Sequence, residues 1–150
     1  MTKVQELSVF LEHLLQQEAL PIPLGKLQLL AASWGEVTLG LHWQGREPLP
    51  TAVLSVLISS VLVVTAASVG AQVTPLNCGI NFTQIPAIGS EFRVQSTLKH
   101  RGRSTLVLDS RLVRADGQIV ATSLATLFVI GHFDEFPEKW YNNLFFCDKY

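Results

Sequence analysis

Residues 52–71 read AVLSVLISSVLVVTAASVGA and contain no charged side chain. A helix that is hydrophobic all round is buried in a protein core or spans a membrane, and a span needs about 20 residues. Five Ser and Thr side chains interrupt the stretch, no Trp or Tyr belt flanks it, and the strand-rich region that follows needs a core partner. We therefore expect a fully buried central helix from Pro50 to near Gly70, with a membrane-anchored protein as an alternative.

The residues before this stretch predict a helix followed by a hairpin. Thr2 and Gln5 form a capping-box pattern, and apolar residues recur behind them at helical spacing, so we expect an amphipathic helix over residues 2–19. Residues 26–32 and 37–43 are apolar runs separated by a short turn, and the second run alternates apolar and polar side chains. This pattern is typical of two antiparallel strands.

Four further strands are expected after the central helix. They cover residues 77–85, 91–100, 104–114 and 118–130, and turns that contain Gly or Pro separate them. Apolar and polar residues alternate within 91–100, so one face of this strand meets water. We predict a meander, and with it an α+β architecture in which a curved antiparallel sheet wraps a long central helix, with an additional N-terminal helix.

Composition limits the classes of function. A chain of 150 residues has the size of one domain, and with 48% hydrophobic but only 15% charged residues it is apolar enough to predict a homodimer or homotetramer. The net charge of −1 argues against a nucleic-acid partner. Cys78 and Cys147 show neither metal-ligand spacing nor a dense disulfide pattern, which favours a reduced, cytoplasmic protein without a metal. No signal peptide and no cofactor are expected.

Three short motifs lie at the turns of the expected meander. They are Ile80-Asn81-Phe82 followed by Pro86-Ala87 and Gly89, then Lys99-His100-Arg101-Gly102-Arg103, then Asp116-Gly117-Gln118-Ile119-Val120-Ala121. In order and spacing they resemble the hotdog-fold acyl-CoA thioesterases of the phenylacetate-degradation (PaaI-like) type, over about residues 20–130. The resemblance implies a hotdog domain over residues 1–131, followed by a tail over 132–150, and an acyl-CoA thioester as the ligand.

In the resembled family, an Asn and then a His-Gly-Gly lie in the loop before the central helix, and an Asp or Glu follows on the helix. A gap-free count back from Phe82 places Gln44 at the Asn, residues 50–52 at the His-Gly-Gly and Ser59 at the acid. No carboxylate lies on this helix. The resemblance therefore implies a degenerate catalytic motif, with Ser59, Gln44 and the loop residue Glu47 as candidate catalytic residues.

Thioester hydrolysis needs a base or a nucleophile, and donors for the developing oxyanion. The resemblance places the amides of Ala52 and Val53 at the positive end of the helix, where they can polarise a carbonyl. A serine nucleophile needs a neighbouring base, and His42, Glu47 and His100 are candidates, with a dimer interface as one route between them. The alternative for the helix serines is packing, with each hydroxyl bonded to a carbonyl one turn earlier.

The resemblance also assigns residues outside the helix. His100, Arg101 and Arg103 lie where the family approaches the nucleotide end of coenzyme A, and the forked donors of Arg suit phosphate. Asn81 lies on the strand that runs close to the active centre. The structural alternatives are a solvated turn for the basic residues and a satisfied backbone group for Asn81.

Residues 132–150 hold seven of the thirteen aromatic side chains. They either cover the domain's own surface or form an interface or a lid over an acyl site. The leading function is an acyl-CoA thioesterase-like protein that hydrolyses or binds acyl-CoA thioesters. The alternative is a hotdog protein without catalysis that binds a hydrophobic ligand or serves as an assembly module, and whether the protein is an enzyme depends on the missing base.

Overall fold

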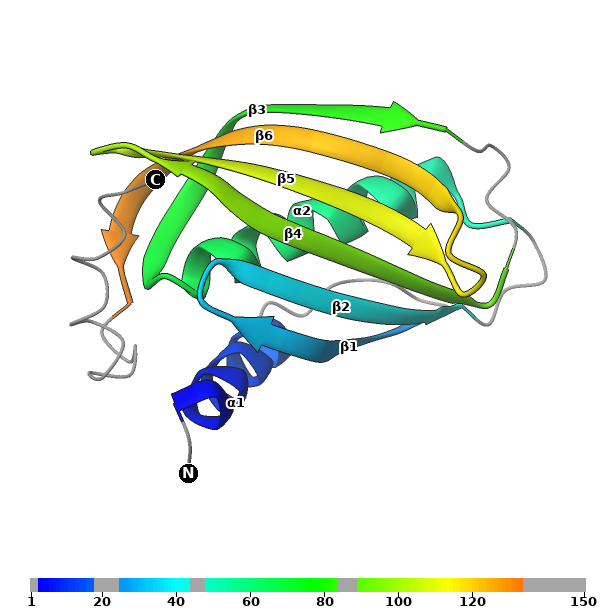
Figure 1. Cartoon of the computed structure of the whole chain (residues 1–150), viewed down its shortest axis with the longest axis horizontal. Coiled ribbons are helices and arrows are strands. Elements are labelled where there is room, and N and C mark those ends of the chain that lie inside the picture. Colours follow the sequence, from blue (N-terminus) through cyan, green and yellow to red (C-terminus); the bar gives the residue numbers. More distant parts are fainter. Residues whose placement is uncertain (1–2, 18–24, 44–47, 84–88, 134–150) are drawn as a thin grey trace.

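The computed structural model describes residues 3–17, 25–43, 48–83 and 89–133. In this part of the chain a six-stranded antiparallel sheet curves around one long helix, and a second helix packs beside one edge of the sheet (Figure 1). The elements are α1 (Lys3–Gln17), β1 (Gly25–Ser33), β2 (Glu36–Trp43), α2 (Thr51–Ala67), β3 (Ala71–Phe82), β4 (Glu91–Arg101), β5 (Thr105–Arg114) and β6 (Ile119–His132). The predicted α+β architecture is confirmed.

The central helix α2 begins one residue later than expected. Pro50 has extended backbone angles and is the N-cap, and its carbonyl accepts the amide hydrogen of Leu54 at 3.1 Å. At the other end Gly70 adopts a φ of 80°, in the left-handed region that glycine enters without strain. The predicted end near Gly70 is therefore confirmed, and the predicted helical Pro50 is wrong.

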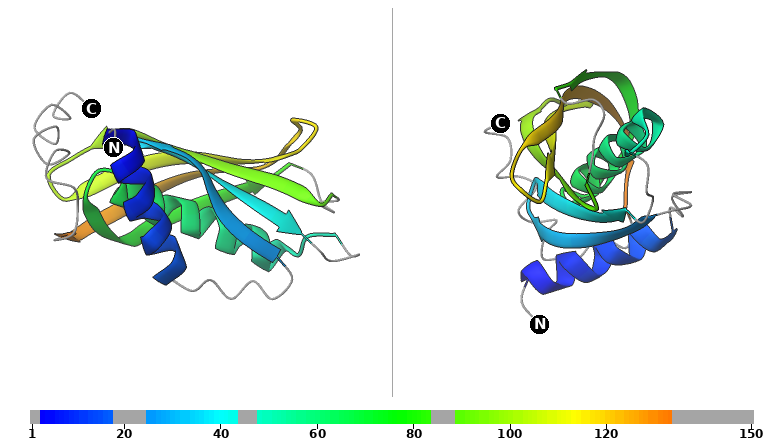
Figure 2. Two further views of the ribbon diagram at one scale, coloured as in Figure 1. Left: turned by 90° about the horizontal axis from the view of Figure 1, so that it is seen from below. Right: turned by 90° about the vertical axis from the view of Figure 1, so that its right-hand side faces the viewer.

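The expectation of a fully buried α2 is corrected. Ten residues of α2 are buried, because the curved sheet wraps one side of the helix (Figure 2). The opposite side carries the exposed Ala52 and Ser59 between partly buried valines. Within the described residues, no helix has both the length and the apolar character that a membrane span needs. The uncharged stretch therefore has one face in the core and one face open.

Strand order differs from the predicted meander. The order across the sheet is β1-β2-β4-β5-β6-β3, so β3 crosses to the far edge and pairs with β6 from Ala71↔His132 to Phe82↔Ala121. It begins at Ala71 rather than at residue 77, and its register slips between Pro75 and Asn77. Proline lacks an amide donor and is confined to edge strands and bulges. Because of Pro75, the sequence pattern did not predict the first half of this edge strand.

The alternation predicted for residues 91–100 is confirmed in β4. Phe92, Val94 and Leu98 are buried on the concave face of the sheet, which packs on α2, while Glu91 and Arg93 are exposed on the convex face. The same alternation runs through β5 and the first part of β6. The sheet therefore has one covered face and one face in water.

The two edges of the sheet differ. Helix α1 packs along β1 and buries Leu7, Leu11 and Leu14 in the core, which confirms the amphipathic helix within the described residues (Figure 2). Thr2 of the predicted capping box lies outside them. The hydroxyl oxygen of Ser68, after α2, accepts the amide hydrogen of Gly35 at 3.0 Å and so fastens the β1–β2 turn to the helix.

Candidate functional site

The open face of α2 forms an apolar groove with a volume of about 270 Å³ beside α1. Its walls are Leu15, Ser55, Val56, Ser59, Ser60, Val63 and Val64. The hydroxyl of Ser55 donates to the carbonyl of Thr51 at 3.1 Å, and that of Ser60 donates to the carbonyl of Val56 at 2.6 Å. These two serines therefore take the packing role. Ser59 is exposed in the groove, and its hydroxyl has no hydrogen-bond partner among the described residues.

The N-terminus of α2 lacks a side-chain cap. The first helical hydrogen bond uses the amide of Leu54, so the amides of Ala52 and Val53 precede it, and no acidic residue lies in the first turn. Unsatisfied amides at this end carry the positive part of the helix dipole. The arrangement leaves donors for a carbonyl oxygen or an anion. The candidate loop residues Gln44 and Glu47 lie outside the described residues.

Within the described part of one chain, no candidate base lies beside Ser59. His42 lies on the convex face of the sheet, away from α2, and forms a hydrogen bond with Glu91. Asn81 is exposed and pairs with Thr122 on the same outward side, because its neighbours on β3 pack toward the core. Both side chains are therefore separated from the groove by the sheet.

The basic turn between β4 and β5 lies at the opposite end of the domain from the N-terminal end of α2 (Figure 1). The carbonyl of Ser104 in this turn accepts the amide hydrogen of Val129 on β6 at 2.8 Å. His100 and Arg103 are exposed, whereas Arg101 is half-buried and its Nη1 is enclosed without a hydrogen-bond partner among the described residues. Within one chain, the proposed nucleotide-binding turn and the helix N-terminus are therefore far apart.

The Asp-Gly motif forms the turn between β5 and β6. Asp116 Oδ1 accepts the amide hydrogen of Gln118 at 3.0 Å, Arg114 Nη2 donates to Asp116 Oδ2 at 2.8 Å, and Gly117 has a φ of 86°. The backbone hydrogen bond from Gln118, and then the Arg114 guanidinium, lower the pKa of the Asp116 carboxyl below its ordinary value. The motif therefore has a structural role in this turn.

Three serines cross the concave face of the sheet in one row. Ser96 pairs with Ser110 and Ser110 with Ser123, and all three are at most 4% exposed. The hydroxyls of Ser96 and Ser110 have no hydrogen-bond partner among the described residues, while Ser123 Oγ lies 3.4 Å from the exposed Cys78 Sγ. Sequence reasoning missed this row because each serine comes from a different strand.

Two other expectations concern metals and the tail. Among the described residues, no three His, Cys, Asp or Glu side chains lie together as a metal site would require. Of the aromatic tail, the structure describes Phe133, whose ring meets that of Phe10 edge-on at a centroid distance of 5.5 Å. Residues 134–150 lie outside the described residues, so the division into a domain and a tail remains a prediction.

Several solved structures share this fold. A thioesterase family protein from Silicibacter pomeroyi is 22% identical with a TM-score of 0.71, over 83% of this chain and 99% of that chain. The PaaI protein of the E. coli phenylacetic acid degradation operon is 15% identical with a TM-score of 0.70, over 87% and 98%. A hypothetical thioesterase from Streptococcus pneumoniae with coenzyme A is 18% identical with a TM-score of 0.69, over 80% and 94%.

No family model matches the sequence, and no curated protein matches it. The class defined by the structure is the hotdog fold of thioesterase-family proteins, which confirms the predicted fold. At these identities the likeness extends to the fold, and the function has to come from the site.

Proposed function

We propose that this protein binds acyl-CoA thioesters, with the acyl group in the groove on α2, and that it hydrolyses them slowly or not at all. The observation that carries the proposal is the position of the apolar groove, which lies on the same helix whose N-terminal amides have no side-chain cap among the described residues. The S. pneumoniae structure with the same fold contains coenzyme A, which supports this class of ligand.

The groove suits a short acyl group. Val56 and Val63 line it, and a volume of about 270 Å³ is at the lower end of small-molecule sites. The thioester carbonyl then lies toward the N-terminal end of α2, where the amides of Ala52 and Val53 stabilise negative charge on oxygen. Ser59 contributes a hydroxyl that can donate to the ligand or to a water molecule.

A homodimer completes the site. Among the described residues of one chain, nothing covers the β3 edge or the open face of α2, and an antiparallel pairing of two β3 edges would extend the sheet across two subunits. A two-fold axis at this edge reverses the chain direction, so the turn with Arg101 and Arg103 of one subunit would approach the α2 N-terminus of the other. The two halves of the expected coenzyme A site would then meet, in a dimer or in a pair of dimers.

Among the described residues no base lies on the groove side, which favours binding of acyl-CoA without catalysis. The resemblance places Ser59 at the position of the family's carboxylate, and general acid or base catalysis typically contributes about 10² to 10⁴-fold to a rate. Removal of that contribution affects turnover more than binding. We place either activity in the cytoplasm, a proposal that rests on the cysteine content of the chain.

Two measurements on the intact protein test these functions. Calorimetry with coenzyme A at two salt concentrations should show binding that weakens with salt, and Arg101→Ala combined with Arg103→Ala should weaken it further and reduce its salt sensitivity. Arg111→Ala, on β5, is the control for loss of an exposed arginine, because Arg111 is exposed as Arg103 is. Failure of coenzyme A and of every acyl-CoA to bind would contradict both functions.

A panel of acyl-CoA chain lengths distinguishes the enzyme from the binder. We expect turnover far below the usual enzymatic range of about 1 to 10³ per second. If turnover is detected, Ser59→Ala tests the serine, because a serine nucleophile would form a covalent acyl-enzyme that mass spectrometry detects. Turnover within the usual range would contradict the placement of Ser59 at the position of the family's acid.

A further inference from the structure

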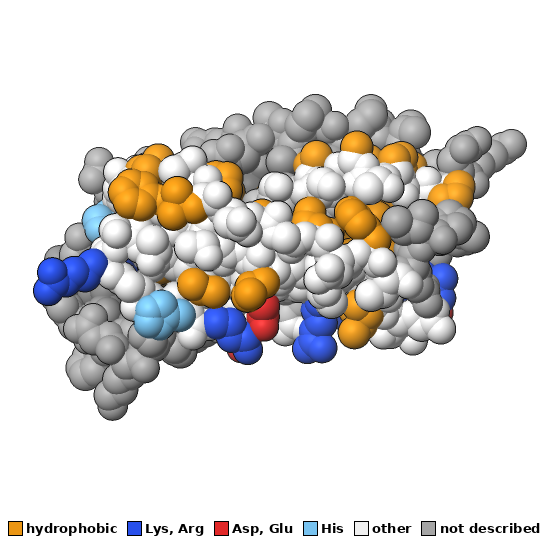
Figure 3. Space-filling model, turned by 90° about the horizontal axis from the view of Figure 1, so that it is seen from above, with side chains coloured by type: hydrophobic (Ala, Val, Ile, Leu, Met, Phe, Trp, Pro, Cys, Tyr) orange, Lys and Arg blue, Asp and Glu red, His pale blue; other side chains and the backbone are white. Residues whose placement is uncertain are grey.

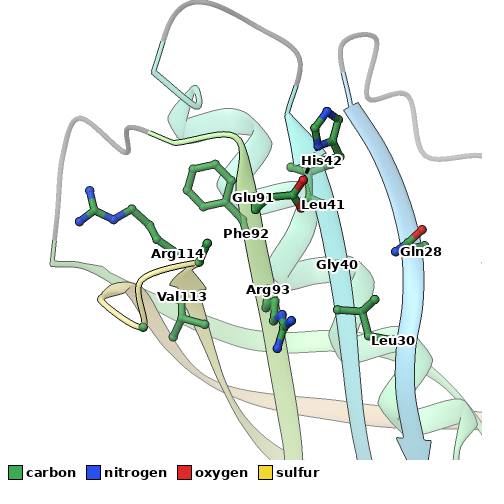
Figure 4. A pocket seen from close by; sticks show the side chains of 12 residues that line it. Gln28, Leu30, Gly40, Leu41, His42, Glu91, Phe92, Arg93, Val113 and Arg114 are labelled. Atoms are coloured by element: carbon green, nitrogen blue, oxygen red, sulfur yellow. Dashed lines mark hydrogen bonds and ion pairs between the residues drawn. The ribbon is translucent and has the colours of Figure 1, made fainter.

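A second hollow lies on the convex face of the sheet, on the opposite side from the α2 groove (Figure 4). Its volume is about 620 Å³, and β1, β2, β4 and β5 contribute to it. Gln28, Gly40, Arg93 and Val113 follow one another across these four strands in register. The proposed acyl-CoA site uses none of these residues.

Gly40 gives the hollow its shape. In a row of outward-pointing residues this position has no side chain, and the side chain of Leu30 lies over it (Figure 4). A Cβ atom at Gly40 would lie 2.8 Å from Leu30 Cδ1, which is closer than real Cβ contacts allow. Leu30 is therefore held as an apolar wall on one side, and Val113 forms the wall on the other side.

The charges around the hollow leave one cation without a counter-ion. His42 is hydrogen-bonded to Glu91, and Arg114 is paired with Asp116 at 2.8 Å. Arg93 lies between the apolar walls, is exposed, and forms no ion pair or hydrogen bond within the described part of the chain. An exposed guanidinium with five unused donors in a concave setting is suited to a planar anion.

We propose that this hollow binds a small organic carboxylate, with the carboxylate on the Arg93 guanidinium and an apolar body between Leu30 and Val113. A single guanidinium matches the single charge and the flat, forked geometry of a carboxylate. A free phosphate carries more charge than one arginine neutralises and leaves the two apolar walls unused. The ligand class is therefore a monocarboxylate with an aromatic or branched body.

Calorimetry or ligand-observed NMR on the full chain tests the site with 3-phenylpropionate as the probe. We expect saturable binding that weakens about 10- to 100-fold in Arg93→Gln, the loss typical of removing a charged hydrogen-bond partner. Leu30→Ala should weaken 3-phenylpropionate but leave the weaker binding of acetate unchanged. The neutral 3-phenylpropionamide and inorganic phosphate should bind less tightly than 3-phenylpropionate.

Arg111→Gln is the matched control, because Arg111 is exposed on β5 outside the hollow. Retained binding in this variant, with loss in Arg93→Gln and an unchanged thermal midpoint, supports the site. Equal losses in the two variants would mean non-specific attraction to surface charge and would overturn the proposal. It would also fail if 3-phenylpropionate did not saturate the protein, or if phosphate bound more tightly. None of these outcomes depends on coenzyme A binding, so the two proposals can fail separately.

Discussion

The two edges of the sheet differ in how far the chain covers them. Along β1, helix α1 covers the edge with three buried leucines, and the Ser68–Gly35 hydrogen bond fastens the hairpin to α2. Along β3, side chains are exposed on both faces, and Leu76 remains 60% exposed. From the β3 side, hydrophobic groups lie among uncharged atoms, and charged side chains gather toward one border (Figure 3).

This difference separates an edge that α1 covers from an edge that nothing covers among the described residues. An open strand edge presents unpaired amide and carbonyl groups that another strand can pair with. The open face of α2 is a second uncovered surface. Within the described ranges, the chain covers the β1 edge with its own helix and does not cover the β3 edge, which supports the proposed homodimer.

The largest expected effect is on the covered edge. Leu11 is fully buried under α1, so Leu11→Ala should lower the free energy of unfolding by about 2–5 kcal/mol, measured by denaturant titration. Val9→Ala, at a 55% exposed position of the same helix, should change it by less than about 0.5 kcal/mol. Equal effects of the two variants would mean that α1 does not belong to the core.

The next largest effect on the free energy of unfolding is expected from hydrogen bonds near the two edges. Ser68→Ala leaves the amide of Gly35 without its acceptor, in a buried position, and should cost about 1–3 kcal/mol in the free energy of unfolding. Ser123→Ala, near the open edge, should cost less, because its partner is the exposed thiol of Cys78. If Ser123→Ala lowered stability more than Ser68→Ala in thermal or denaturant unfolding, the β1 edge would not be the more firmly held edge.

A smaller effect is expected on association at the open edge. Leu76→Lys places a charge where a second β3 would pair, and should weaken the homodimer about tenfold, which corresponds to about 1.4 kcal/mol. Light scattering over a concentration series measures this change. Val9→Lys, on the covered side, should leave association unchanged. A wild-type protein that is monomeric at micromolar concentration would contradict the dimer itself.

The smallest effect concerns the turn between β5 and β6. The pKa of Asp116 is lowered in the folded protein, so its contribution to stability is present above its unfolded pKa and disappears as the pH falls through the lower folded value. An NMR titration of the Asp116 carboxyl should show this lowered pKa. Arg114→Gln should raise it, since Arg114 donates to the carboxylate. An unchanged pKa would mean that backbone hydrogen bonds, chiefly that from the Gln118 amide, cause the shift without Arg114.

Local patterns in the sequence predicted most elements but not their neighbours. The hairpin, the Gly70 turn just after α2 and the alternation in β4 follow from side-chain periodicity and glycine conformation, both of which depend on adjacent residues. The crossing of β3 to β6 was not predicted, because strand partners depend on contacts across the whole sheet. Pro75 lacks an amide donor, so the sequence around it did not predict a strand. The same residue is tolerated in β3 because β3 is an edge strand.

The candidate site was predictable in part. Ser59 lies exposed in the α2 groove and its catalytic role stays a prediction, whereas Asn81 and His42 lie on the far face of the sheet. The hollow at Arg93 and the serine row were not predicted, because each assembles residues from several strands without a motif in any one segment. Ligand sites built across a sheet leave little local signal.

The sequence by itself determined that an uncharged helix would be the centre of an antiparallel sheet, because so long an apolar stretch needs a core and the strands around it alternate. Only the tertiary structure decided which face of that helix is buried, which edge of the sheet is covered, and which cation remains unpaired. These features depend on residues distant in sequence, such as Leu30 over Gly40, whose contacts exist once the sheet has formed.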